Sequence, residues 1–93
     1  MTAPRITWIR AGDRYPDLKH DLDHFLALDG DEEIGVVKWI GLGPDCGWFW
    51  SMTLVHPGAP FKRPTWGQCA TRAQAARALG ACYSALRAWF GLE

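Results

Sequence analysis

Residues 24–40 read HFLALDGDEEIGVVKWI, two apolar runs separated by a short polar segment. The first run, Phe25 to Leu28, leads into Asp29-Gly30, and the second, Ile34 to Ile40, is rich in the β-branched residues that favour strands. An Asp-Gly pair supplies the positive φ angles that a tight hairpin turn needs. The stretch therefore predicts two antiparallel strands joined by a turn.

A third strand is predicted after this hairpin. Residues 41–47 contain three glycines and a proline, which interrupt regular structure, and residues 48–55, WFWSMTLV, then resume an alternating strand pattern. Residues 1–20 form an irregular N-terminal segment, and its short apolar group, Ile6, Trp8 and Ile9, adds an edge strand if it pairs with the sheet. We expect a three-stranded antiparallel meander over residues 24–55, or a four-stranded one.

The C-terminal part of the chain predicts one amphipathic helix over residues 71–90. Thr71 and Gln74 have the spacing of a capping box, which marks a helix start. Apolar residues then recur at helical spacing: Ala75, Leu79, Cys82, Leu86 and Trp89. Residues 56–70 contain three prolines and two glycines and predict a loop. The fold class is therefore α+β, a meander packed on one helix, and 93 residues support a single domain.

Strand alternation assigns each side chain to one face of the sheet. Because a lysine is costly to bury, we place the face with Lys38 outside and the face with Val37 and Trp39 inside. The inner face of the third strand is then the set Trp48, Trp50, Met52 and Leu54. We expect this inner face to receive the apolar stripe of the helix.

The outer face carries several apolar residues around one lysine. Its expected residues are Ile34, Val36, Lys38, Ile40, Phe49 and Val55. Such patches mark interaction sites, and six tryptophans in so short a chain also indicate exposed aromatic surface. The sequence therefore predicts a protein-binding module whose partner is another protein or a second copy of the chain. Whether residues 1–20 fold across this face stays open.

The composition argues against several other classes of protein. The formal net charge is zero, whereas proteins that bind duplex DNA through its phosphates usually carry a basic excess. No motif places a nucleophile beside a base or forms a phosphate-binding loop, so we expect no enzyme and no cofactor. The start of the chain lacks the apolar run of a signal peptide, and Cys46, Cys69 and Cys82 show no pairing motif. We expect a cytoplasmic protein with free thiols and no membrane association.

Three alternatives remain open. In nucleic-acid binding, basic residues would contact phosphates and a tryptophan would stack on bases. The candidate residues are Lys38, Lys62, Arg63, Arg72 and Trp66.

A metal site is the second alternative. His20 and His24 lie four residues apart beside two aspartates, a spacing that can hold a metal. A solvated segment is the commoner structure for such a stretch, and we expect no metal. A small inhibitor carried by a mobile element against host defence also fits a compact domain without catalytic groups.

Parts of the chain resemble two known groups of proteins. Over roughly residues 24–90 it is similar to short uncharacterised bacterial proteins with strand–turn–strand–strand–helix order, in the residues Leu28-Asp29-Gly30, Ile34-Gly35, Gly43-Pro44, Gly47 to Met52, Gly67 and Ala70 to Ala75. This resemblance implies the fold and brings no activity with it. A weaker likeness is to the three-stranded, single-helix arm-binding domains of phage integrases. Those domains present several basic residues on the sheet, and this sheet offers only Lys38, so the likeness implies the fold without the DNA binding.

Overall fold

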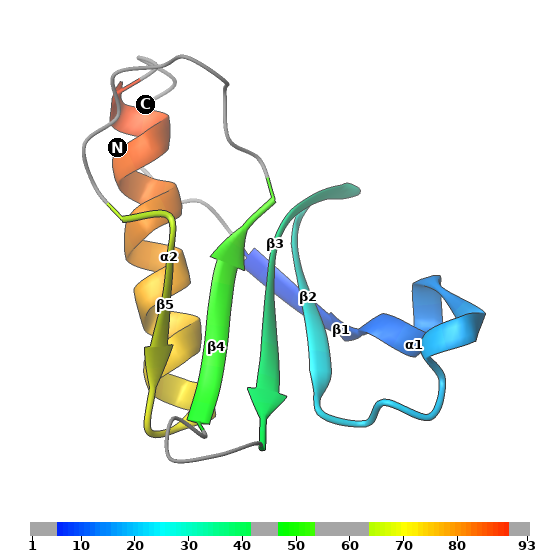
Figure 1. The fold of residues 1–93 in the computed structure, drawn as a ribbon. Coiled ribbons are helices and arrows are strands. Elements are labelled where there is room, and N and C mark those ends of the chain that lie inside the picture. The colour runs from blue at the N-terminus through cyan, green and yellow to red at the C-terminus, as the bar shows by residue number, and fades with distance from the viewer. Residues whose placement is uncertain (1–5, 42–46, 54–63, 90–93) are drawn as a thin grey trace.

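The chain forms a five-stranded antiparallel sheet with one long helix against it (Figure 1). The computed structural model describes residues 6–41, 47–53 and 64–89. Its elements in chain order are β1 (Ile6–Arg10), α1 (Ala11–Arg14), the 3-10 helix η1 (Pro16–Leu18), β2 (His24–Asp29), β3 (Glu32–Ile40), β4 (Gly47–Met52), β5 (Trp66–Cys69) and α2 (Arg72–Trp89). The strands are neighbours in sequence order. The α+β class with a C-terminal helix is confirmed, with five strands where we expected three or four.

The β2–β3 hairpin turns where the sequence predicts it. Asp29 pairs with Glu32 across a turn formed by Gly30 and Asp31. Gly30 has a φ of 65°, and no other described residue has a positive φ. This is the pattern of a type II′ turn, which needs glycine at its first central position. The turn therefore depends on Gly30.

The two strands beyond the predicted meander lie at its edges. β1 pairs with β2 from Ile6↔Asp29 to Arg10↔Phe25, so the short N-terminal apolar group does form a strand. β5 pairs with β4 inside the segment that we expected to be a loop. A Cβ atom on Gly67 would lie 2.8 Å from the indole nitrogen of Trp50. The glycine that suggested a loop is thus required by the close approach of a neighbouring ring within a strand pair.

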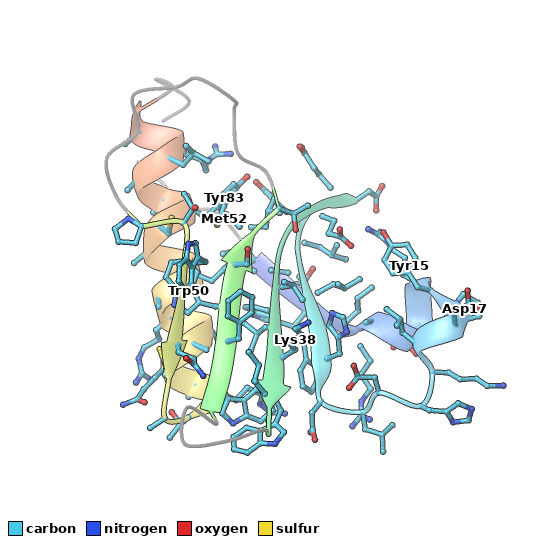
Figure 2. All side chains as sticks on the ribbon, in the orientation of Figure 1. Tyr15, Asp17, Lys38, Trp50, Met52 and Tyr83 are labelled. Carbon is cyan, nitrogen blue, oxygen red and sulfur yellow. The ribbon has the colours of Figure 1, made fainter. Side chains whose placement is uncertain are left out.

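The main core lies between α2 and one face of the sheet, which we name the helix face. α2 contacts β3, β4 and β5, and in the view of Figure 1 it runs behind β5 and to the left of β4. The buried residues of this core are Ala27, Ile34, Val37, Trp50, Met52, Ala75, Leu79, Cys82, Tyr83 and Leu86, of which Trp50, Met52 and Tyr83 are labelled in Figure 2. The predicted packing of the helix stripe on the inner face is confirmed for these residues. Leu54 and the side chain of Trp89 lie outside the described residues.

The capping box at the start of α2 is confirmed by two reciprocal hydrogen bonds. The backbone N–H of Gln74 donates to Oγ1 of Thr71 at 3.1 Å, and the backbone N–H of Thr71 donates to Oε1 of Gln74 at 3.1 Å. Both bonds satisfy donors that the first helical turn leaves without intrahelical partners. The helix therefore begins where the sequence predicts.

Ile34 is buried in the core, and its expected place on the outer face was wrong. The pairing of β2 with β3 passes from Ala27↔Gly35 to Leu28↔Glu33, which leaves Ile34 as one extra residue. Such a bulge breaks the alternation of side chains along the strand. Ile34 is consequently fully buried together with Leu79 and Val37.

Trp39 lies on the helix face as predicted but outside the core. It pairs with Trp48, and the two rings meet edge-on with centroids 5.6 Å apart. Trp39 lies near the end of β3 and does not join the buried cluster under α2, so it remains 43% exposed.

The opposite face of the sheet, the outer face, is covered in part by the segment between β1 and β2. Leu26 and Leu28 alternate with Ala27 and so belong to this face, yet both are buried. α1 contacts β1 and β2, and the Tyr15 hydroxyl donates to Oε1 of Glu33 at 3.3 Å. The N-terminal segment therefore covers the β2 side of the outer face, on the side of the sheet far from α2 (Figure 1).

Candidate functional site

Most of the residues predicted for a protein-binding surface do lie together on the outer face. Val36, Lys38 and Ile40 alternate along β3, and Phe49 is paired directly with Lys38 from β4. All four side chains are half-buried. Val55 lies outside the described residues. The sheet thus places three apolar side chains around one lysine.

Trp66 extends this surface onto the edge strand. It pairs with Ser51, so its side chain shares the outer face with Val36 and Phe49. Its ring centroid is 6.2 Å from that of Phe49, and the side chain is 64% exposed. We name the four apolar residues Val36, Ile40, Phe49 and Trp66 the outer patch.

Lys38, which is labelled in Figure 2, supplies a positive charge among the residues of the outer patch. Along β3 it lies between Val36 and Ile40, and across the sheet it lies between His24 and Phe49. No ion pair joins Lys38 to a carboxylate in the part of the chain that the structure describes. The patch therefore combines apolar area with one cation.

The residues predicted for nucleic-acid binding do not share one surface. Lys38 and Trp66 lie on the outer face, whereas Arg72 begins α2 on the helix face. The guanidinium carbon of Arg72 is 5.0 Å from the centroid of the Phe25 ring. Lys62 and Arg63 lie outside the described residues.

The histidine-rich segment before β2 holds one contact between potential ligands. Nδ1 of His24 lies 3.3 Å from Oδ2 of Asp21, and His20 is exposed. Within residues 6–41, 47–53 and 64–89, no group of three or more histidine, cysteine, aspartate or glutamate side chains is placed to hold a metal ion. Cys69 is a half-buried free thiol.

The structure also contains a groove that the sequence did not reveal. It lies on the helix face between the β1–β2 pair and the start of α2, with a volume of about 700 Å³. Its walls include Trp8, Arg10, Phe25 and Arg72. Alternation in residues 6–10 places Trp8 and Arg10 on one face, but only the pairing of Arg10 with Phe25 brings that face toward α2.

A polar cluster fixes the far end of α2 to the sheet. The Tyr83 hydroxyl and Nη1 of Arg87 both donate to Oδ2 of Asp29, at 2.5 and 3.3 Å. Burial and the hydrogen bond to Asp29 raise the pKa of Tyr83. This cluster joins β2 to α2 and lies apart from the outer patch.

Comparison of the chain with protein-family models, curated proteins and solved structures finds no match. The two resemblances given above therefore stay predictions. Among the described helices, none has the length and apolar character needed to span a membrane.

Proposed function

We propose that this chain is a non-enzymatic binding module that docks another protein through the outer patch. The observation that carries the proposal is Trp66, a large aromatic side chain 64% exposed beside Phe49 on a sheet face that α2 does not cover. Apolar side chains gathered on an open face in this way are typical of protein interfaces. Aromatic residues are also the commonest anchors of binding energy at such interfaces.

The chemistry of the outer patch favours a partner of defined type. An apolar surface with an acidic side chain opposite Lys38 would bury the patch and neutralise its one cation. A two-fold dimer centred on the patch would instead bring two copies of Lys38 together, which costs free energy unless a carboxylate intervenes. The proposed partner is therefore a different protein with an acidic group on its apolar face. An inhibitor acting on another protein would use the same kind of surface.

Affinity capture with a matched pair of tryptophan variants tests this proposal. Trp66→Ala removes an exposed ring from the outer patch, and Trp39→Ala removes an exposed ring from the helix face. We expect a discrete protein to be retained by the wild type and by Trp39→Ala and lost from Trp66→Ala. Lys38→Glu should lose it as well, because the charge opposite the acidic group is reversed. Equal retention by all variants would contradict the proposal.

Two further measurements separate the alternatives. Light scattering measures whether the chain associates with itself. A dimer for the wild type together with a monomer for Trp66→Ala would mean that the partner is a second copy of this chain. A salt-sensitive mobility shift of single-stranded DNA that is lost in Arg72→Gln would favour nucleic-acid binding, because phosphate contacts weaken with salt. The proposal expects a monomer and no shift.

A further inference from the structure

The groove on the helix face has the size and lining of a small-molecule site. Its volume of about 700 Å³ lies within the range usual for ligand pockets. Trp8 and Phe25 form apolar walls on the sheet side, and Ala76 contributes a small side chain from α2. α2 packs mainly on β3, β4 and β5, and near the start of the helix β1 and β2 extend past it and leave this space open. The outer patch lies on the opposite face, which makes the groove a separate site.

Two arginines of the groove lie over the same aromatic ring, that of Phe25. The guanidinium carbon of Arg10 is 5.9 Å from the Phe25 centroid, and that of Arg72 is 5.0 Å from it. A guanidinium that stacks through its flat face keeps its N–H donors at the edge, where they can pair with an oxyanion. Neither arginine forms an ion pair with any residue that the structure describes. Both arginines are also exposed, so their N–H donors are available to a ligand.

We infer that the groove binds a small aromatic carboxylate. Its ring would lie against Trp8 and the small side chain of Ala76. Its carboxylate would accept charge-assisted hydrogen bonds from Arg10 and Arg72. Asp13 also lines the groove, so its charged side chains sum to a single positive charge. That balance matches a monoanion. A phosphate monoester, with close to two negative charges, would leave an excess of negative charge beside Asp13.

Titration with 2-naphthoate, followed by calorimetry and by the NMR shifts of the Trp8 indole, tests this inference on the full chain. From the size of the ligand we expect a dissociation constant on the order of 0.1–1 mM. Arg10→Gln and Arg72→Gln should each weaken binding about tenfold, as the loss of one charged hydrogen bond does. Arg77→Gln is the matched control, because Arg77 is exposed on α2 away from the groove lining, and it should leave the affinity unchanged.

Two analogues define the chemical class. The neutral 2-naphthamide should bind about tenfold more weakly than 2-naphthoate, since it lacks the charge that both arginines recognise. The dianion 2-naphthyl phosphate should bind more weakly than 2-naphthoate. The Asp13→Asn variant removes one negative charge from the groove, so it should reduce the difference between the dissociation constants of the two ligands. Phosphate binding that exceeds carboxylate binding would overturn the assignment of a carboxylate.

Either of two results would contradict the proposal that the groove is a binding site. One is no heat and no indole shift at about 5 mM 2-naphthoate, a concentration well above the expected dissociation constant. The other is binding that both arginine variants leave unchanged. Neither result bears on the outer patch, because the groove variants alter only the helix face.

Discussion

Gly67 and Gly80 differ in how much space the structure leaves for a side chain at each position. A Cβ on Gly67 would lie 2.8 Å from the Trp50 indole nitrogen, closer than real Cβ contacts allow, whereas a Cβ on Gly80 would meet only Ile6 Cδ1 at 3.8 Å. Gly67→Ala should therefore lower the free energy of unfolding by ~1–3 kcal/mol, the usual cost of overpacking. Gly80→Ala should raise it by up to ~1 kcal/mol, because alanine favours a helix interior.

Urea denaturation of the two variants beside the wild type measures both effects. A Gly67→Ala protein as stable as Gly80→Ala would mean that β5 does not approach Trp50 as closely as the structure shows.

Tyr83 gives the fold a predictable response to alkaline pH. Burial first, and then the hydrogen bond to Asp29, raises its pKa above the ordinary value of 10.0, against the opposing effect of Arg87. Because the folded-state pKa exceeds the unfolded one, the stability that this group contributes is fully present below about pH 10 and is lost as the pH rises through the folded-state pKa. The stability advantage of wild type over Tyr83→Phe should thus be constant near neutral pH and shrink above about pH 10.

Chemical denaturation at a series of pH values checks this prediction. Tyr15→Phe is the matched control, because the Tyr15 hydroxyl also donates to a carboxylate, Glu33, but its side chain is exposed. If the stability advantage of the wild type over Tyr83→Phe stays unchanged up to about pH 11, the ionisation of Tyr83 is not coupled to unfolding in the way predicted here.

At the scale of elements, α2 has one face that the fold depends on and one that it does not. Leu86 is buried in the core, and Arg77 is exposed. Leu86→Ala should lower the free energy of unfolding by ~2–5 kcal/mol, as other buried large-to-small changes do. Arg77→Ala should change it by no more than ~0.5 kcal/mol, the usual range at exposed positions. Thermal melts of the two variants decide the matter, and equal damage would mean that α2 is rotated relative to the sheet.

The elements that could be predicted from sequence are those fixed by local chemistry. The Thr71 and Gln74 side chains cap their own helix, and Gly30 turns its own hairpin, so neighbouring residues carry the information. The bulge at Ile34 and the pairing of β5 with β4 depend on the partner strand instead. Alternation alone therefore placed Ile34 on the wrong face. The prolines and glycines around residues 66–69 predicted a loop, so β5 was not expected.

At the scale of the whole molecule, the sheet separates two surfaces of different chemistry. The outer patch was largely predictable, because Val36, Ile40 and Phe49 follow simple alternation around Lys38. The groove was not, because it joins β1, β2 and the start of α2, which lie far apart in the chain. Arg10 and Arg72 meet at Phe25 only when the sheet is assembled. The part of a surface that one strand pair forms can be predicted from the sequence more readily than a surface that joins elements far apart in the chain.

Site-directed photo-crosslinking in cells tests the docking role of the outer patch most directly. A photoreactive phenylalanine analogue replaces either Trp66, on the outer face, or Trp39, on the helix face, both of which are exposed. We predict that position 66 forms a discrete adduct with a different protein, that Lys38→Glu abolishes this adduct, and that position 39 does not form it. Adducts of equal yield at both positions, or none at position 66, would contradict the assignment of the outer patch as a protein-docking surface.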